Sequence, residues 1–493
     1  MKDIRELEGL LAAKMPIVAI ESHEEAKVTQ MLERFCVLNE RPFWSWSVTN
    51  GLKRSNGLES AFNTTRIEDA LRHIEKSPSN AIYLFLDAHR FIDDPVVLRQ
   101  IKDIAAKAES THRMLVFLSG RLEVPHEIQR ITAHFRPALP DARRVAEILN
   151  EEARRYREST GEQVKANREA LNVVTQHLGG LTEEDARRLA RMAIRDDGAI
   201  SAADIARVLK AKHELVASSE ILVLETGVPH IDELGGLAGL KRWLAVRREV
   251  FMSASADTAL PAPKGVLLLG VQGAGKSLAA KCVAGAWQLP LFRLDFGALY
   301  QKYHGETERN IREALAVANA MAPCVLWMDE IEKGVAADSG GEADGGVSRR
   351  VLGTLLTWMN ERAARVFLVA TANDIAGLPP ELLRKGRFDE IFFVDLPGAA
   401  AREEILRIHL RRNRQDPAAF NLAQLSAACE GFSGAEIEQA IVAGLYEAHA
   451  ARQPLSSALV EKELKRTRPL SVVMAEKVQA LRAWARERTV PAD

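Results

Sequence analysis

A glycine-rich turn between an apolar run and an amphipathic stretch is the strongest chemical signal in the chain. Residues 265–283 read GVLLLGVQGAGKSLAAKCV, the pattern of a phosphate-binding loop between a strand and a helix. Glycines let backbone N–H groups curl around phosphate oxygens, and the helix N-terminus adds a partial positive charge. We expect Lys276 to contact the terminal phosphates of a nucleotide and the Ser277 hydroxyl to coordinate magnesium. The expected nucleotide contacts in this loop are Gly270, Gln272, Gly273, Ala274, Gly275, Lys276, Ser277 and Leu278.

A second apolar run, CVLWMDE, ends in two carboxylates, Asp329 and Glu330. One carboxylate is needed to hold magnesium, and we assign this role to Asp329. The other must orient and deprotonate a water molecule, and we assign this role to Glu330. A third apolar run, VFLVATAND, presents Asn373 at its end. Because ligands sit at the carboxyl ends of parallel strands, Asn373 should lie beside the same water.

Each of these motifs also has a purely structural interpretation. A glycine-rich segment can be an ordinary turn, an Asp-Glu pair can be a solvated helix cap, and an Asn before Asp can form a turn. Arg384 and Arg387 in LPPELLRKGRFDEIFFVDLP would be solvated and of little consequence on an ordinary surface. The order of the four segments along the chain favours one shared site.

The phosphate loop, the Asp-Glu strand, the Asn strand and the arginine segment together resemble the AAA family proper of the AAA+ ATPases. The resemblance implies ATP and Mg²⁺ as cofactors and a homo-oligomer, expected to be a hexameric ring. It also implies that Arg384 and Arg387 reach the nucleotide of a neighbouring subunit and stabilise charge during phosphoryl transfer. By the same similarity, Gly235 lies in the adenine-contacting segment, and Gly434 and Ala435 lie where the helical lid meets the nucleotide.

The segment LYQKYHGETERN resembles the family's central-pore loop, in which an aromatic and an aliphatic residue precede a glycine. Tyr303 and Gly305 match that pattern, whereas His304 stands where an aliphatic residue is usual. The three residues are therefore candidates for gripping a protein client, and a Tyr packed beneath its own loop is the alternative. Residues 338–346, which are acidic and glycine-rich, are either a second pore loop or a surface loop without a role.

The wider pattern predicts an α/β protein with two P-loop-type parallel-sheet domains, each followed by a helical lid. Apolar runs alternate with amphipathic stretches in residues 16–140, and a helical pattern follows before the second α/β region begins. Residues 454–469 are expected to be an exposed break before a final amphipathic helix. The expected parts are 1–141 (degenerate AAA-like domain), 142–217 (lid-like bundle), 218–397 (active AAA+ domain), 398–452 (lid) and 453–493 (C-terminal helical extension).

The first α/β region lacks the chemistry of the second. Its strand AIYLFLDAH keeps Asp87, but Ala88 stands where the catalytic acid would be. The run PIVAIES leads into HEEAKV without glycines and without a Lys-Ser pair, so we expect no ATP hydrolysis there. A degenerate ATPase-like domain before an active one resembles the Ycf-type AAA proteins, a family named for a hypothetical chloroplast reading frame.

The charge balance indicates which class of partner to expect, and the cysteine spacing indicates which cellular compartment. With 66 basic and 67 acidic residues, the chain carries no electrostatic footprint of a nucleic-acid binder. The four cysteines form no CxxC pair, which argues against a disulfide framework and a zinc site and fits a reducing cytoplasm. The N-terminus predicts neither a signal peptide nor a membrane anchor, and no run reaches the roughly 20 apolar residues that span a bilayer.

The expected activity is ATP hydrolysis coupled to remodelling or threading of a protein client that the sequence does not identify. A nucleotide-dependent binding switch that threads nothing is the alternative. A nucleic-acid loader is disfavoured by the neutral charge.

Overall fold

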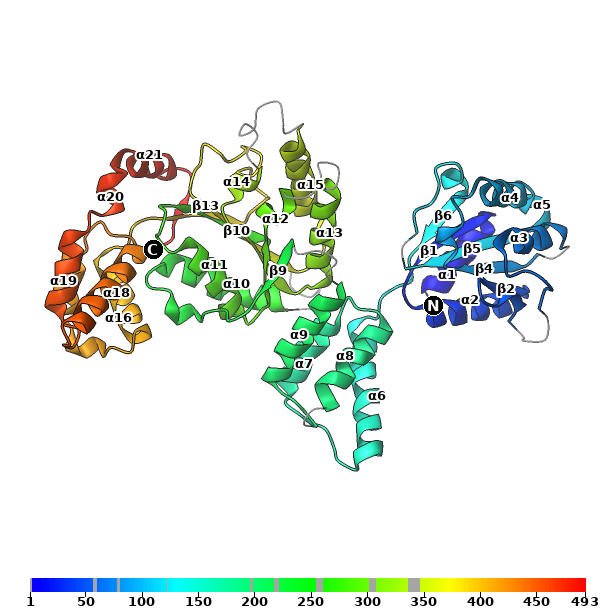
Figure 1. Ribbon diagram of the computed structural model, residues 1–493, viewed down its shortest axis with the longest axis horizontal. Helices are drawn as coiled ribbons and strands as arrows, with labels where there is room; N and C mark the ends of the chain where they lie inside the picture. The colour runs from blue at the N-terminus through cyan, green and yellow to red at the C-terminus, as the bar shows by residue number, and fades with distance from the viewer. Residues whose placement is uncertain are drawn as a thin grey trace. The chain divides into compact units, whose positions relative to one another are not determined.

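The computed structural model describes residues 2–55, 60–77, 80–120, 122–195, 198–216, 221–253, 260–300, 307–335 and 346–493. The chain separates into two units, which are treated one at a time below (Figure 1). The first comprises Met1–Asp141 and Thr182–Asp185, and the second comprises Ala142–Leu181 and Ala186–Asp493. The finer division of the chain into five parts stays a proposal.

The first unit is built on a six-stranded sheet in the order β3-β2-β4-β5-β1-β6. Every neighbouring pair of strands is parallel except β2 and β3. Strands that are buried on both faces carry nearly continuous apolar sequence, as β4 does with IYLFL. The strands are β1 (Ile17–Glu21), β2 (Phe43–Ser47), β3 (Gly51–Arg54), β4 (Ile82–Leu86), β5 (Met114–Ser119) and β6 (Thr132–Phe135).

Helices cover both faces of this sheet. Leu7 of the first helix and Phe35 of the second pack on one face with Val18 and Leu84. The third and fourth helices pack on the other face, where they meet Tyr83 and Phe117 among others. The helices are α1 (Lys2–Ala12), α2 (Glu25–Leu38), α3 (Ile67–Lys76), α4 (Pro95–Ala106) and α5 (Ala108–Thr111).

The second unit begins with helices that share a core of aliphatic side chains, including Val145, Leu178, Leu189 and Val208. The connection between α6 and α7 pairs with the connection between α8 and α9 through two short parallel strands, β7 and β8. The elements are α6 (Ala142–Thr160), β7 (Lys165–Ala166), α7 (Arg168–Leu178), α8 (Glu183–Arg195), β8 (Ala199–Ile200) and α9 (Ala202–Val216).

A seven-stranded sheet follows, in the order β15-β14-β10-β13-β12-β11-β9. All its pairs are parallel except β9 with β11. The apolar runs that precede the phosphate loop, the Asp-Glu pair and Asn373 form strands β10, β12 and β13, respectively. These three strands are neighbours in the sheet. The strands are β9 (Leu222–Glu225), β10 (Gly265–Gly270), β11 (Leu291–Leu294), β12 (Cys324–Met328), β13 (Val366–Ala372), β14 (Glu390–Val394) and β15 (Val490–Pro491).

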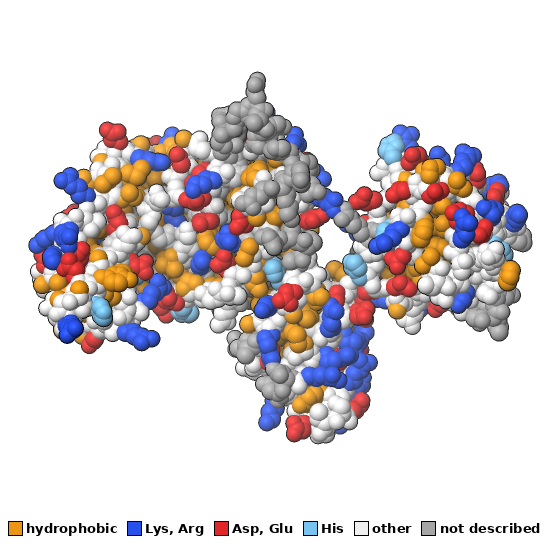
Figure 2. All heavy atoms as spheres, viewed as in Figure 1, with side chains coloured by type: hydrophobic (Ala, Val, Ile, Leu, Met, Phe, Trp, Pro, Cys, Tyr) orange, Lys and Arg blue, Asp and Glu red, His pale blue; other side chains and the backbone are white. Residues whose placement is uncertain are grey.

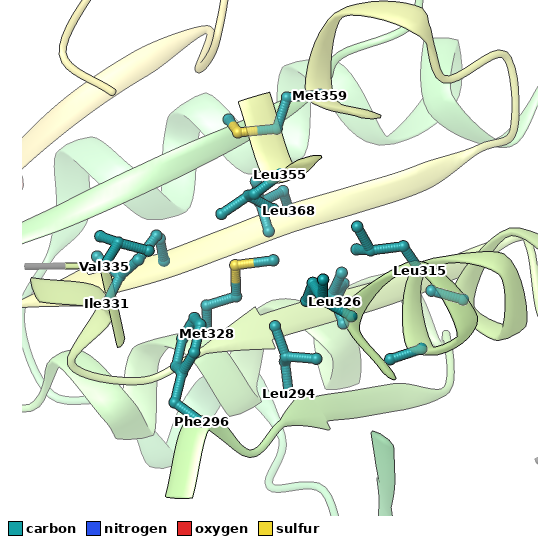
Figure 3. Packing of buried hydrophobic residues seen from close by; sticks show 14 of the residues in the cluster. Leu294, Phe296, Leu315, Leu326, Met328, Ile331, Val335, Leu355, Met359 and Leu368 are labelled. Carbon is teal, nitrogen blue, oxygen red and sulfur yellow. The ribbon is translucent and has the colours of Figure 1, made fainter. Parts of the chain in front are cut away.

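Two hydrophobic clusters sandwich this sheet. On one face α10 (Ala238–Met252) and α11 (Lys276–Trp287) pack against the strands. On the other face, Leu315 and Leu355 belong to the same cluster as Leu326 and Leu368 of the central strands (Figure 3). The helices on that face are α12 (Phe296–Tyr300), α13 (Thr307–Ala320), α14 (Ile331–Val335) and α15 (Val347–Glu361).

A helical lid follows the sheet, and the chain then continues into three further helices. The expectation of an exposed break at residues 454–469 was wrong, because α19 lies there. Ser456 caps this helix by accepting from the N–H of Leu459 (3.4 Å), and Val460 and Leu464 are buried in the lid core. The helices are α16 (Ala399–Arg412), α17 (Leu422–Ala428), α18 (Gly434–Ala450), α19 (Ser457–Arg466), α20 (Leu470–Val473) and α21 (Ala475–Ala485).

The two sheets share one strand order. Around the strand that leads into the phosphate loop, the second sheet reads β14-β10-β13-β12-β11-β9, and the first reads β6-β1-β5-β4-β2-β3. The last strand of each series is antiparallel to its neighbour. The predicted fold class, an α/β protein with two parallel-sheet domains of the same architecture, is therefore confirmed.

Candidate functional site

The glycine-rich loop joins β10 to α11, and the first turn of that helix lines a cavity together with the loop. Gly273 and Gly275 have left-handed backbones (φ 76° and 97°) that glycine adopts without strain. The N–H of Ala435 in the lid donates to the carbonyl of Gly273 (3.2 Å). The loop therefore makes one of the contacts between the sheet and the lid.

Lys276, the first residue of α11, is 5% exposed and folds back on its own loop. Its Nζ donates to the carbonyl oxygens of Gly270 (2.9 Å) and Val271 (2.8 Å). Burial lowers the pKa of Lys276 to about 8. A phosphate group beside this ammonium would compensate its charge far better than two carbonyl oxygens do.

Two side chains that could coordinate a metal through oxygen, the hydroxyl of Ser277 and the carboxylate of Asp329, meet beside the phosphate loop. Ser277 donates from its Oγ to Asp329 Oδ1 (2.9 Å), and Thr371 donates to the same oxygen. This pairing brings together residues that lie far apart in the sequence. Magnesium is commonly held by only one or two protein oxygens together with substrate phosphates. The donor set of Ser277 and Asp329 therefore fits a magnesium ion that also binds a nucleotide.

Glu330 and Asn373 lie side by side at the ends of β12 and β13. Asn373 Nδ2 donates to Glu330 Oε1 (2.8 Å), and the backbone of Glu330 is left-handed (φ 47°). The N–H of Glu330 is held by Thr371 Oγ1 (3.0 Å). A bulky residue in this conformation costs free energy, and such strain is characteristic of functional sites. The carboxylate and the amide are thus hydrogen-bonded to each other at the ends of two neighbouring strands.

Glu332 is a further carboxylate that the sequence did not single out. Its Oε1 accepts from the N–H of Asn373 (2.9 Å), and its side chain is buried. Burial raises the pKa of Glu332. Its Oε2 has no hydrogen-bond partner in the described part of the chain. Glu332 fixes the backbone of Asn373, whose side chain in turn touches Glu330.

Lys333 holds the second oxygen of Glu330, since its Nζ lies 2.5 Å from Glu330 Oε2. The hydrogen bond to Glu330 raises the pKa of Lys333. Both oxygens of the expected general base are thus engaged, one by an amide and one by a cation. A water molecule must compete with Lys333 for the carboxylate.

Lys333→Ala should raise the basal ATPase rate about 1.5- to 5-fold, because an exposed ion pair contributes only about 0.2 to 1 kcal/mol. Steady-state phosphate release measures this rate, and Lys333→Arg, which keeps the charge, should stay near the wild-type value. A lower rate in Lys333→Ala would mean that the lysine supports hydrolysis rather than restraining it.

The phosphate loop lines a cavity of about 450 Å³ between the sheet and the lid, together with Asp329, Glu330, Thr371 and Asn373. Glu332 and Lys333 lie outside this lining. Gly270 of the predicted set lies outside the lining and instead accepts a hydrogen bond from Lys276. The predicted residues that line the cavity are Gly235, Gln272, Gly273, Ala274, Gly275, Lys276, Ser277, Leu278, Asp329, Glu330, Asn373, Gly434 and Ala435.

The lid helix α16 supplies a wall of this cavity that the sequence did not predict. A Cβ at Gly235 would lie 2.6 Å from Ile405 Cγ1, so glycine allows the lid to pack closely there. Arg412 on the lid pairs with Glu233 on the other side of the cavity (2.9 Å). Burial lowers the pKa of His409, which also lines the cavity. The cavity thus changes shape if the lid moves.

Arg384 and Arg387 do not line the cavity. Arg387 is half-buried and donates from Nη1 to the carbonyl of Leu356 in α15. Arg384 is exposed, and its carbonyl accepts a hydrogen bond from the N–H of Arg387 (3.4 Å). Its guanidinium makes no hydrogen bond or ion pair with another residue that the structure describes. The two arginines are therefore not part of the phosphate site of their own chain.

The predicted pore-loop residues Tyr303, His304 and Gly305 lie outside the described residues. The same is true of residues 338–345 in the acidic loop.

The first unit has different groups at the place that corresponds to the phosphate loop. The imidazole of His23 lies against Gly120, where a Cβ would come within 2.4 Å of its Cε1. Helix α2 follows with Glu24 as its N-cap, without a side-chain capping bond. A carboxylate there repels phosphate, and Asp87 at the end of β4 has no second acid beside it. The first sheet thus has the strand order of the second but lacks the residues of its phosphate site.

No cluster of three or more His, Cys, Asp or Glu side chains in the described residues is arranged to hold a metal ion. None of the helices in the described ranges is both long enough and apolar enough to cross a membrane.

Family comparisons agree with the fold and the site, which together define an AAA ATPase. Residues 266–396 match the AAA family of ATPases associated with various cellular activities. Residues 3–136 and 143–219 match the N-terminal and second domains of SpoVK-like AAA ATPases. The chain therefore has an ATPase's nucleotide-binding module preceded by two SpoVK-like domains.

Full-length relatives define the family more closely. The AAA domain-containing protein ycf46 of Pyropia yezoensis is 33% identical over 491 residues, covering 98% of both chains. The ycf46 protein of Guillardia theta is 34% identical over 490 residues, covering 98% of this chain and 95% of its own. The chain belongs to this ycf46 family of AAA proteins. A cell division cycle protein 48 homolog of Archaeoglobus fulgidus is 35% identical over 235 residues, 45% of this chain and 31% of the homolog.

Proposed function

We propose that the second unit hydrolyses ATP with Mg²⁺ in the cavity described above, as one member of a ring of identical chains. We also propose that this cycle remodels or threads a protein client. The observation that carries the proposal is the convergence of Ser277, Asp329 and Glu330, linked by hydrogen bonds to Thr371 and Asn373.

The phosphate site has a clear division of labour in this proposal. Lys276 and the N–H groups of its loop bind the phosphates. Ser277 and Asp329 would hold Mg²⁺, which when bound neutralises charge on the phosphate oxygens.

Hydrolysis then needs a positioned water molecule. Glu330 orients it and accepts its proton while the water oxygen bonds to the γ-phosphorus. The bond from that phosphorus to the β–γ bridging oxygen breaks, and ADP and phosphate result. Asn373 keeps the water molecule and Glu330 in the positions that the reaction requires.

In this proposal, assembly completes the site by supplying a further cation, beside Lys276 and Mg²⁺, for the charge that builds up on the transferred phosphoryl group. Arg384 is exposed and away from the phosphate loop of its own chain, which suits a residue that enters a neighbour's cavity. A hexameric ring is the arrangement implied by resemblance to the AAA family.

A protein is the client that the charge balance favours. Basic and acidic side chains are intermixed on much of the face seen in Figure 2, in keeping with a formal net charge of -1. Nucleic acid is a less suitable partner for such a surface. The free, buried cysteines fit a reducing compartment such as the cytoplasm.

Tyr303→Ala should reduce stimulation of the ATPase by casein, used as a loosely folded probe, and leave the unstimulated rate unchanged. We expect a loss of about two- to tenfold, the range for one aromatic contact. Tyr303→Phe keeps the ring and should keep the stimulation. A wild-type rate that casein does not raise, or a stimulation that Tyr303→Ala keeps in full, would favour the binding switch over threading.

A further inference from the structure

Residues 490–493, the C-terminal strand segment, are built into the ATPase domain. β15 extends the sheet beside β14, with Val490 opposite Phe392. The N–H of Ala492 donates to the carbonyl of Phe393 (3.0 Å), and its own carbonyl accepts from the N–H of Leu240 (2.9 Å). Ala492 is 1% exposed and belongs to the core under α10 and α11. The chain thus returns from α21 to the N-terminus of α10 (Figure 1).

That segment ends against one wall of the nucleotide cavity. Residues 233–237, the Gly-Gly wall, contribute Glu233, Leu234 and Gly235 to the lining. The wall then turns sharply, because Gly236 and Leu237 both have left-handed backbones (φ 71° and 55°). A bulky residue such as leucine rarely adopts this conformation, and it persists only where the surroundings enforce it. The turn at Leu237 therefore needs outside support.

Two carboxylates supply this support. Asp493 accepts a hydrogen bond at Oδ1 from the N–H of Leu237. Glu404 of lid helix α16 accepts at Oε2 from the N–H of Gly236 (2.8 Å). Hydrogen bonds to charged acceptors are stronger than those between neutral groups. Both N–H groups of the turn are thus held, one by the C-terminal strand segment and one by the lid.

Helix α10 is shaped to accept the segment. A Cβ at Gly239 would lie 3.1 Å from the carbonyl oxygens of Pro491 and Ala492 and 3.2 Å from that of Asp493. These distances are shorter than ordinary contacts of a side chain, so a larger residue at Gly239 would push the segment away.

The preceding helices connect the same segment to the lid. Arg482 on α21 makes hydrogen bonds to both carboxylate oxygens of Asp395 (2.8–3.0 Å). Further upstream, the N–H of Leu470 donates to Glu436 Oε1 (2.8 Å). Glu436 belongs to the capping box that starts α18, next to Ala435 in the cavity lining. The residues after the lid therefore contact both sides of the cavity.

We propose that the C-terminal strand segment is part of the nucleotide-binding machinery, and that Asp493 is a positioning residue for the Gly-Gly wall. The proposal rests on the assignment of this cavity to ATP. Asp493 stands behind the wall and does not line the cavity, so it acts on ATP binding and leaves the hydrolytic step to Glu330.

Asp493→Ala in the full-length chain should weaken ATP binding and raise the KM about five- to tenfold, the size of one ordinary hydrogen bond. The kcat should stay within about twofold, since no group near the phosphates changes. Asp493→Asn keeps an oxygen that accepts from Leu237, so it should bind ATP nearly as the wild type does. Gly239→Leu, which displaces the segment from the other side, should weaken binding at least as much as Asp493→Ala.

Titration with a fluorescent ATP analogue and steady-state kinetics give these constants. Asp493 is exposed, so Asp493→Ala should fold normally, as thermal unfolding would verify. An unchanged ATP affinity in Asp493→Ala, or an equal loss in Asp493→Asn, would overturn the positioning role. Lys276→Ala distinguishes a wrong role for Asp493 from a wrong assignment of the cavity to ATP. If Lys276→Ala still binds the analogue normally, the cavity is not the nucleotide site and the proposal falls with it.

Discussion

Glu330→Gln should bind ATP as tightly as the wild type and lose about a hundredfold or more of its hydrolysis rate. A general base contributes about 10²- to 10⁴-fold to such reactions, and an amide cannot accept the proton of the water. Glutamine has nearly the same shape and can still accept a hydrogen bond from Asn373, so the cavity should keep its form. Single-turnover hydrolysis and equilibrium binding of ATP measure the two effects separately.

Lys276→Ala is the matched control because it should fail at the earlier step. Without the ammonium, the phosphates lose the cation that their own loop supplies, and binding should be lost. The two variants should therefore differ, one saturated with unhydrolysed ATP and one empty. Turnover at the wild-type rate in Glu330→Gln would show that another group is the base, and Glu332 would be the first to examine.

Arg384→Ala/Arg387→Ala should lower kcat about a thousandfold or more and leave ATP binding near the wild-type value. Cations supplied from a neighbouring subunit typically contribute 10³- to 10⁵-fold to phosphoryl transfer. Binding should survive because neither side chain lines the cavity of its own chain. Steady-state rates at saturating ATP, with the oligomeric state checked by light scattering, give the comparison.

The two single variants should show which arginine contributes only to catalysis and which also stabilises the fold. The exposed guanidinium of Arg384 forms no hydrogen bond or ion pair within the described residues, so Arg384→Ala should keep the wild-type melting temperature while it loses activity. Arg387 holds the carbonyl of Leu356, so Arg387→Ala should also lower that temperature. Full activity in Arg384→Ala would remove this residue from the proposed mechanism.

Much of the fold and the phosphate site was predictable because the central strands are buried on both faces. Strands β10, β12 and β13 are continuous apolar runs, and each ends directly in residues with recognisable chemistry. In the sheet the three strands are neighbours in the order β10-β13-β12, and this order, which the sequence did not predict, brings Ser277, Asp329 and Asn373 to one edge.

The lid wall and the C-terminal strand segment were not predictable, since they depend on distant contacts. The helical pattern of α16 does not reveal which side chains, such as His409 and Arg412, face the cavity. β15 is two residues long, and only pairing with β14 makes it a strand. The prolines at 454 and 469 suggested a break, but they flank a helix that Ser456 caps.

The most direct test of a site shared between neighbouring chains is to mix two inactive variants. Arg384→Ala/Arg387→Ala keeps its own phosphate loop, and Lys276→Ala keeps its arginines. At a mixed interface, the intact loop of the first variant meets the intact arginines of the second. We predict that ATPase activity returns on mixing, while each variant alone stays near background. Demonstrated co-assembly without recovery of activity would contradict the account and leave both arginines with a structural role.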